Sequence, residues 1–237
     1  MKEIFFDEID STNTYLKNHY EQLEDMTFVS ANLQTAGRGR KGRTWLSNKG
    51  ENLMFSLLIK DSEMYRHYSS LSVISAYTII EVLKEYGVDN LSFKWPNDVY
   101  VDGKKICGIL LEAISREDLE CLIIGVGINV NQKQFVGDYI REPVSLTNLL
   151  NKDIDLDELR KKIYERFIYN IDLLRNGYDF YDDIQQYDYL KDRVVYMNIN
   201  NEIKQVKVIR VDNDYSLRIL DDTGERNIDS GEVSFHV

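Results

Sequence analysis

Four stretches with strand character follow one another between residues 91 and 130, and no helix-length segment separates them. Asp102-Gly103, between the second and third stretches, is a two-residue hairpin turn, because both positions tolerate a positive φ. Strands joined by such a turn pair antiparallel, so this region excludes regular βαβ winding. The third strand has apolar residues on both faces and is therefore expected in the interior of a sheet. The predicted strands cover residues 91–93, 99–101, 104–114 and 119–130.

The remaining strands and the helices flank this region. Asp10-Ser11 can cap the first helix, and Gly87 can end the second, as residues of these types do at helix termini. The predicted strands are 2–7, 26–32 and 53–60, and the predicted helices are 11–24, 63–86, 145–150, 155–176 and 178–190. Together they predict an α+β domain over residues 1–189, with a mixed, mainly antiparallel sheet and flanking helices.

The last 48 residues have a different pattern, in which short strands alternate with turns rich in Asn, Asp and Gly. Five short strands joined by tight turns are typical of a small barrel. The strands are expected at residues 194–199, 203–211, 215–220, 225–228 and 232–235. The sequence therefore predicts a second, C-terminal domain over residues 190–237.

Composition excludes several classes of protein. The net charge of −11, from 29 basic and 40 acidic residues, argues against a general nucleic-acid binder, whose affinity depends on neutralising phosphates. Neither a secretory signal nor a membrane-spanning stretch is recognisable, so we expect a cytoplasmic protein. Cys107 and Cys121 lie among apolar residues and are expected to be buried thiols. The three histidines are scattered, which argues against a zinc site or a catalytic triad.

The segment 37–45 is the strongest candidate site, with three glycines and four basic residues in a chain that is acidic overall. Glycines let a backbone approach a ligand, and Arg38, Arg40 and Arg43 can grip carboxylate and phosphate oxygens. Trp45 offers a flat face for a purine. A solvated basic turn or a nucleic-acid patch is the alternative interpretation, and the acidic chain and the adjacent Trp weigh against it.

A second candidate combines the ends of two predicted strands. Asn97 and Asp98 stand where one strand begins. Lys105 follows the hairpin turn on the interior strand, where a charge is costly unless an anion meets it. Gly108 could leave room for a ligand against the sheet. Alternatively, Lys104 and Lys105 are merely solvated at the tip of the hairpin.

Two further segments are informative only in combination with the others. Glycines at positions 125 and 127 of a strand admit a close neighbour, and Asn129 could bind a ribose, a phosphate or a metal-bound water. A bulge at the strand end is the alternative. The segment 11–13 (Ser-Thr-Asn) could merely cap a helix, although capping would also point its polar groups toward the same end of the sheet.

In this combination and order, the segments resemble the catalytic core of biotin protein ligases. The resemblance covers nearly the whole chain and rests on residues 10–13, 34, 37–45, 94–98, 104–110, 112, 125–129 and 231–234. It implies a class II synthetase-like core followed by an SH3-like β-barrel. It also implies two reactions. Biotin and ATP, with Mg²⁺, give biotinyl-5′-AMP and pyrophosphate, and a lysine of a biotin carboxyl carrier domain then accepts the biotinyl group.

The resemblance also assigns roles to residues. Lys105, Arg38 and Arg40 would be catalytic, and Asp98 would organise the acceptor lysine. No residue is implied as a direct metal ligand, although Asn129 could reach the metal through water. The residues implied for biotin are Ser11, Thr12, Asn13, Gln34, Gly37, Arg38, Gly39, Arg40, Lys105 and Gly108. Those implied for ATP and the adenylate are Arg38, Arg40, Arg43, Trp45, Asn97, Lys105 and Asn129.

Some members of that family carry an N-terminal DNA-binding domain that represses biotin synthesis genes. Here Ser11 comes almost at once, so we expect a ligase that has no DNA-binding domain and no nucleic-acid or membrane partner; a homodimer is possible. Three other functions stay open. They are a lipoate or octanoate ligase or transferase of related fold, a non-catalytic biotin- or nucleotide-sensing module, and, last, a nucleic-acid-binding module.

Overall fold

A computed structural model describes residues 2–137, 139, 141–199, 202–229 and 233–236. Its main sheet has seven strands in the order β1-β2-β3-β7-β6-β5-β4. The strands are β1 Lys2–Phe6, β2 Thr27–Ala31, β3 Asn52–Ile59, β4 Leu91–Lys94, β5 Asp98–Val101, β6 Lys104–Ser115 and β7 Leu119–Asn129. The β1–β2 pair is parallel and the other neighbouring pairs are antiparallel. The predicted α+β class and the mainly antiparallel sheet are confirmed.

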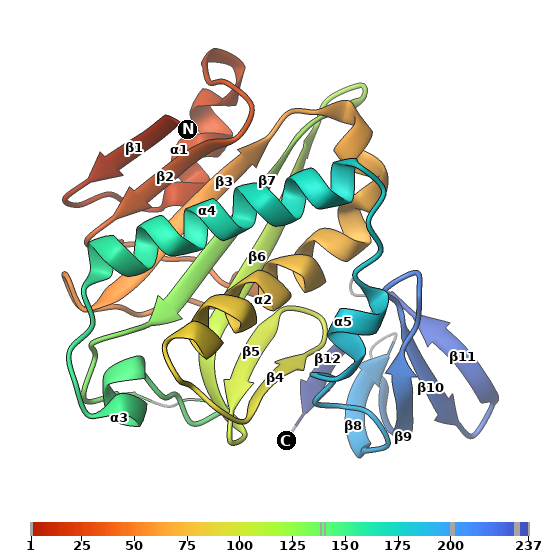
Figure 1. Ribbon diagram of the computed structural model, residues 1–237. Coiled ribbons are helices and arrows are strands. Elements are labelled where there is room, and N and C mark those ends of the chain that lie inside the picture. Colours follow the sequence, from red (N-terminus) through yellow and green to blue (C-terminus); the bar gives the residue numbers. More distant parts are fainter. Residues whose placement is uncertain (1, 138, 140, 200–201, 230–232, 237) are drawn as a thin grey trace.

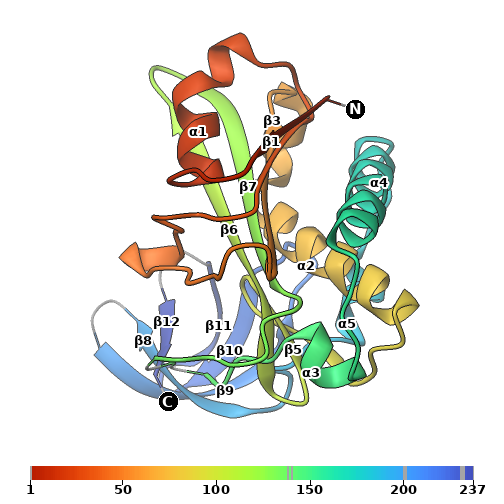
Figure 2. The same ribbon diagram turned by 90° about the vertical axis from the view of Figure 1, so that its left-hand side faces the viewer.

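Helices cover both faces of this sheet unequally. The long helices α2 and α4 lie across one face, and α1 lies on the other, next to the segment that joins β2 to β3 (Figures 1 and 2). The helices are α1 Thr12–His19, α2 Tyr68–Glu85, α3 Leu146–Leu150, α4 Leu156–Arg175 and α5 Tyr181–Gln185. Because both its faces are covered, β3 is buried along its whole length. In the described part of the chain, no helix combines the length and the apolarity needed to cross a bilayer.

The hairpin turn predicted at Asp102-Gly103 is present in the structure. Asp102 and Gly103 have φ values of 48° and 79°, and they connect Val101 to its partner Lys104. Strand β6 lies between β5 and β7 and is therefore an interior strand. Cys107 and Cys121 are fully buried free thiols, as predicted.

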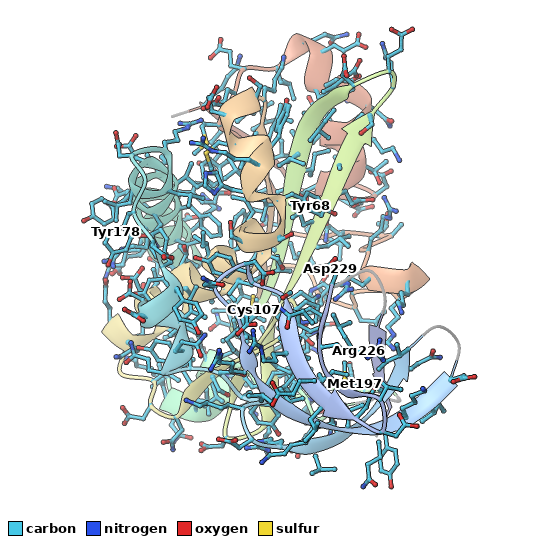
Figure 3. All side chains as sticks on the ribbon, turned by 90° about the vertical axis from the view of Figure 1, so that its right-hand side faces the viewer. Tyr68, Cys107, Tyr178, Met197, Arg226 and Asp229 are labelled. Carbon is cyan, nitrogen blue, oxygen red and sulfur yellow. The ribbon has the colours of Figure 1, made fainter. Side chains whose placement is uncertain are left out.

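The C-terminal residues form a second, antiparallel sheet in the order β11-β10-β9-β8-β12. Its strands are β8 Val194–Ile199, β9 Glu202–Val211, β10 Leu217–Asp221, β11 Gly224–Ile228 and β12 Val233–His236. The indole Nε1 of Trp95 donates to Tyr215 O at 3.0 Å and so ties this sheet to the main one. Figure 3 shows Met197 and Arg226 on the small sheet and Cys107 in the main one. The predicted boundary between residues 189 and 190 stays a prediction, and Gly231 and Glu232 lie outside the described residues.

The predicted helix 178–190 is largely wrong, because α5 spans Tyr181–Gln185. Beyond it, the chain pairs with β4 instead of continuing as a helix. Phe93 N donates to Tyr187 O at 2.6 Å, and Tyr189 N donates to Phe93 O at 2.9 Å. Pairing with a distant strand therefore overrides the local helical pattern.

Three smaller corrections have local causes. The first predicted helix is α-helical only to His19, and a 3₁₀ turn follows, whose Tyr20 carbonyl accepts from Lys60 Nζ at 3.1 Å. The second begins with a 3₁₀ segment over residues 62–67 before α2 starts. The strand expected from Tyr215 starts at Leu217, because Tyr215 has a φ of 64° and closes a turn with Asp212.

Candidate functional site

A cavity of about 480 Å³ is lined by residues of the segment 37–45 and of strands β5, β6 and β7. The helices α2 and α4 lie on the other side of the main sheet from this segment (Figure 2). The volume of the cavity is in the range of small-molecule sites. The predicted residues that line it are Ser11, Thr12, Asn13, Gln34, Arg38, Gly39, Arg40, Arg43, Trp45, Asn97, Asp98, Lys105, Gly108 and Asn129. Gly37 lies beside this set, where a Cβ atom would come within 2.5 Å of the carbonyl oxygen of Trp45. The structure thus gathers four separate stretches of sequence around one cavity.

One end of the cavity is neutral and polar. Ser11 caps α1 by accepting from Thr14 N at 3.4 Å, which sets Thr12 and Asn13 in the first turn facing the sheet. Thr12 N and Oγ1 donate to Gln34 Oε1 at 2.8 and 3.0 Å. Thr12 Oγ1 also lies 2.6 Å from Ser56 Oγ on β3. The buried Thr12 and Ser56 and the half-buried Gln34 thus form a fixed set of donors and acceptors at this end of the cavity.

Asn13 extends this set across the sheet to Glu112 on β6. Its Nδ2 donates to Glu112 Oε2 at 2.9 Å, and its Oδ1 accepts from Ser56 Oγ. Gly125 on β7 makes this possible, because a Cβ atom there would overlap the Asn13 amide. The predicted close neighbour of this glycine is therefore Asn13.

The segment 37–45 folds back on itself as a short hairpin. Gly39 N donates to Arg43 O at 2.7 Å, and Trp45 N donates to Gly37 O at 3.0 Å. Two of its arginine side chains form polar contacts outside the hairpin. Arg38 forms an ion pair with Glu112 at 3.2 Å, and Arg40 Nη1 donates to Asn97 Oδ1 at 3.1 Å. Burial lowers the pKa of Arg40, with Asp98 opposing the effect.

The opposite end of the cavity is cationic. Lys105 forms an ion pair with Asp98 at 2.7 Å, so the predicted anion beside this lysine is a carboxylate of the protein itself. Lys94 is 7% exposed and Nζ donates to Tyr100 OH at 3.4 Å. Burial lowers the pKa of Lys94 to about 8, although Asp98 acts in the opposite direction. Arg43 and Arg141 also line the cavity. Such a group of cations suits a phosphate or carboxylate ligand.

Trp45 lies on the floor of the cavity. A Cβ atom at Gly127 would come within 2.5 Å of its ring atom Cε2, and one at Gly108 would come within 3.0 Å of Cζ3. Lys105 Nζ stands 5.6 Å from the centre of the same ring. The space left by Gly108 and Gly127 is thus occupied by the indole, and the expected contact between Trp45 and a purine stays a prediction.

Asn129 ends β7 at the edge of the cavity and is 4% exposed. Its Nδ2 donates to Val144 O at 3.2 Å and to Lys105 O at 3.4 Å. The side chain therefore helps to hold the segment after residue 140 against β6. Its predicted roles toward a nucleotide or a metal-bound water stay predictions. Among the described residues, no cluster of three or more His, Cys, Asp or Glu could hold a metal ion.

Several lining residues have no local signal of function in the sequence. Phe135 and Arg141 come from the segment after β7, which reaches the cavity because Lys105 N donates to Glu142 O at 2.9 Å and Val144 N to Lys105 O at 2.9 Å. By contrast, Ser56 contacts Thr12 and Asn13 without lining the cavity, and the sequence does carry a signal for it, because it is a lone hydroxyl within the apolar strand β3. A buried polar residue needs a partner, which here is Thr12 or Asn13.

Comparison with known proteins decides the family. The profile of the Biotin/lipoate A/B protein ligase family matches residues 5–129. This chain belongs to that family. Among family relatives, the bifunctional ligase/repressor BirA of Salmonella typhimurium is 34% identical over 164 residues, which is 69% of this chain and 50% of that protein. The biotin--[acetyl-CoA-carboxylase] ligase of Paracoccus denitrificans is 33% identical over 124 residues, 51% of each chain.

Solved structures extend the likeness to the whole length of the chain. The biotin protein ligase of Aquifex aeolicus in complex with biotin and ATP is 30% identical and has a TM-score of 0.88, with 99% of this chain and 98% of that chain covered. Its R40G variant in complex with biotin has a TM-score of 0.86 at 30% identity. By contrast, this chain spans half or less of the length of the BirA proteins from Salmonella typhimurium, Escherichia coli and Bacillus subtilis.

Proposed function

We propose that this chain joins biotin to ATP to form biotinyl-5′-AMP, and then transfers the biotinyl group to a lysine of a biotin carboxyl carrier domain. The observation that carries this proposal is the polarity of the cavity. Its neutral polar end, around Thr12 and Asn13, suits a ureido group, which both donates and accepts hydrogen bonds. Its cationic end, around Lys105, suits a carboxylate and phosphates.

The first step needs cations around the transferring phosphoryl group. An oxygen of the biotin carboxylate attacks the α-phosphorus, and the bond to the bridging oxygen breaks with pyrophosphate leaving. Lys105 and Arg40 line the cavity at the end where this negative charge develops. Fixed charges in a site shielded from water stabilise such a transition state strongly. Mg²⁺ accompanies ATP in this scheme, and Asn129 is the residue we propose to contact it through water.

The second step needs a neutral amine. The acceptor lysine loses a proton, its nitrogen attacks the biotinyl carbonyl, and AMP leaves with the electron pair of the broken bond. Asp98 is the carboxylate in the cavity nearest to Lys105, so it is placed to accept that proton or to orient the amine. Lys105 would face the phosphate of the leaving AMP.

A lipoate or octanoate ligase or transferase is the nearest competing function, because the family is described as containing biotin and lipoate protein ligases. The buried groups of Thr12, Asn13 and Ser56 argue against it. Thr12 and Asn13 line the cavity, and a ureido group can hydrogen-bond to them, whereas a saturated chain or a dithiolane ring offers them no hydrogen bond. A non-catalytic sensing module would retain the polar end without needing the Lys105–Asp98 pair.

Mass spectrometry of a carrier domain tests the proposal. The protein, ATP, Mg²⁺ and biotin are expected to add one biotinyl group to the carrier's lysine, and omission of ATP is the control. Parallel reactions with lipoate and octanoate are expected to leave the carrier unmodified. Modification with either of these acids instead of biotin would identify the competing enzyme. Biotin binding without any modification would identify a sensing module.

We also propose a cytoplasmic location, a single biotinylation function without nucleic-acid binding, and a division into domains near residue 190. The self-association of the chain stays open as a possible homodimer. Gel filtration with light scattering, with and without biotin and ATP, measures it directly.

A further inference from the structure

Gly108 and Gly127 are direct partners across the β6–β7 ladder, and both face the cavity. Neither has a positive φ, so neither position needs glycine for its backbone conformation. Both positions lack room for a side chain. A Cβ atom at Gly127 would meet the ring of Trp45, and one at Gly108 would meet that ring and Lys105 Nζ. The two glycines thus form a slot in the sheet that fits an indole, and this slot is filled by a residue of the chain itself.

The same Trp45 ends the arginine-containing hairpin of residues 37–45. Its backbone N donates to Gly37 O and closes the base of the hairpin. The side chain therefore joins a surface hairpin to the middle of the main sheet. Arg38 follows this base and Arg40 begins the turn at the tip. Arg38 contacts Glu112 on β6, and Arg40 contacts Asn97, which precedes β5. The rigid attachment between hairpin and sheet is the packed indole, because arginine side chains are long and flexible.

We infer that Trp45 is a positioning residue, whose indole, seated in the slot of Gly108 and Gly127, holds Arg38 and Arg40 over the cavity. Without this anchor, the hairpin would still form, but its arginines would sample many positions. Positioning errors of about 1 Å are costly in reactions that depend on fixed charges. The effect on adenylation rests on the proposed function, whereas the seating of the indole does not.

Tryptophan fluorescence reports whether the Trp45 indole is packed against Gly108 and Gly127, and the measurement needs no ligand. Trp45 and Trp95 are the two tryptophans of the chain, and Trp95 is 2% exposed. A Trp45→Phe variant therefore gives the signal of Trp95 alone, which can be subtracted. In Gly127→Ala, we expect the Trp45 emission to shift to longer wavelength, and acrylamide to quench it at least about twofold more strongly. Cys121→Ala, on the same strand but outside the cavity, is the matched control and is expected to leave both quantities unchanged.

Kinetics then distinguish an anchor for Trp45 from a space kept free for ligand. The rate is kcat/KM of biotin-dependent exchange of pyrophosphate into ATP. We expect Gly127→Ala alone and Trp45→Ala alone each to lower it at least about tenfold. The double variant Trp45→Ala/Gly127→Ala should have a kcat/KM within about threefold of that of Trp45→Ala alone. The reason is that the indole which the added methyl group would displace is already absent.

Two results would overturn the inference. One is unchanged Trp45 fluorescence in Gly127→Ala. The other is an equal loss of kcat/KM from Gly127→Ala with and without Trp45, which would mean that the methyl group blocks the ligand itself. If Gly127→Ala does not fold, Gly108→Ala serves for the fluorescence measurement alone, because a Cβ atom there would come within 3.0 Å of both the Trp45 ring and Lys105 Nζ. A wild-type protein that shows no exchange at all would contradict the proposed function, and the fluorescence result would still decide the seating of Trp45.

Discussion

Lys105 Nζ lies 2.7 Å from Asp98 Oδ1, and the two side chains are 28% and 19% exposed. Lys105 is on β6 and Asp98 is at the start of β5, so the hairpin between these strands brings them together. A bound phosphate would compete with Asp98 for the ammonium group. The pair thus joins Lys105, which we propose stabilises the adenylate, to Asp98, which we propose receives the acceptor lysine.

Replacement of Lys105 by Ala should lower the rate of biotin-dependent pyrophosphate exchange by about 10²- to 10³-fold, the usual effect of losing one well-placed donor to a developing charge. The melting temperature should change little, because both side chains of the pair are partly exposed to water. Lys104→Ala is the matched control, since Lys104 pairs with Glu142 at the surface. An equal loss of rate in both variants would show that the hairpin, and not the charge of Lys105, is required.

Gly125→Ala should weaken biotin binding selectively. The added methyl group displaces the Asn13 amide and leaves Ser56 or Glu112 without its partner. The displaced amide is then also lost as a proposed partner of biotin, and a hydrogen bond lost from a buried site costs about 1–3 kcal/mol, or roughly 5- to 150-fold in affinity. Isothermal titration with biotin measures this change. ATP affinity is the internal control and should stay within about threefold, and a parallel loss of both affinities would contradict the separate roles of the two ends.

Lys94 should make the stability of the fold depend on pH. Burial lowers the pKa of Lys94 to about 8 from the ordinary lysine value of 10.5. Between these values the unfolded chain binds the proton more tightly, so folding becomes more favourable as the pH rises. Below pH 8 the folded protein bears the full cost of the buried charge, roughly 3 kcal/mol.

Lys94→Met removes this titration. Urea unfolding of both proteins should show that the free energy of unfolding of the wild type rises by up to about 3 kcal/mol relative to that of Lys94→Met, as the pH increases from 8 to 10.5. Parallel curves for the two proteins across this range would show that Lys94 titrates normally.

The sequence predicts those parts of the fold that depend on neighbouring residues. Asp102-Gly103 forms its turn because both residues accept positive φ, and Ser11 caps α1 because its hydroxyl reaches Thr14 N. The predicted helix after residue 178 fails for the opposite reason. Its residues 187–189 pair with Phe93, almost a hundred positions earlier, and no local pattern contains that information.

The candidate site could likewise be predicted from the sequence only in part. Its basic residues could be recognised in the sequence, because a cluster of arginines in an acidic chain has few other uses. The reason for its glycines could be given only in general terms. Alternate glycines predicted a close neighbour on β7, but the structure is needed to identify that neighbour as Asn13 at one position and Trp45 at the other. Likewise, Asp98 becomes the partner of Lys105 only once β5 and β6 are paired in register.

Exchange of radiolabelled pyrophosphate into ATP tests directly whether the protein forms biotinyl-5′-AMP, because the exchange reports adenylate formation without a carrier protein. With ATP and Mg²⁺ present, we expect exchange that depends on biotin and that lipoate and octanoate do not support. Exchange driven by lipoate or octanoate, or biotin binding without any exchange, would contradict the proposed function.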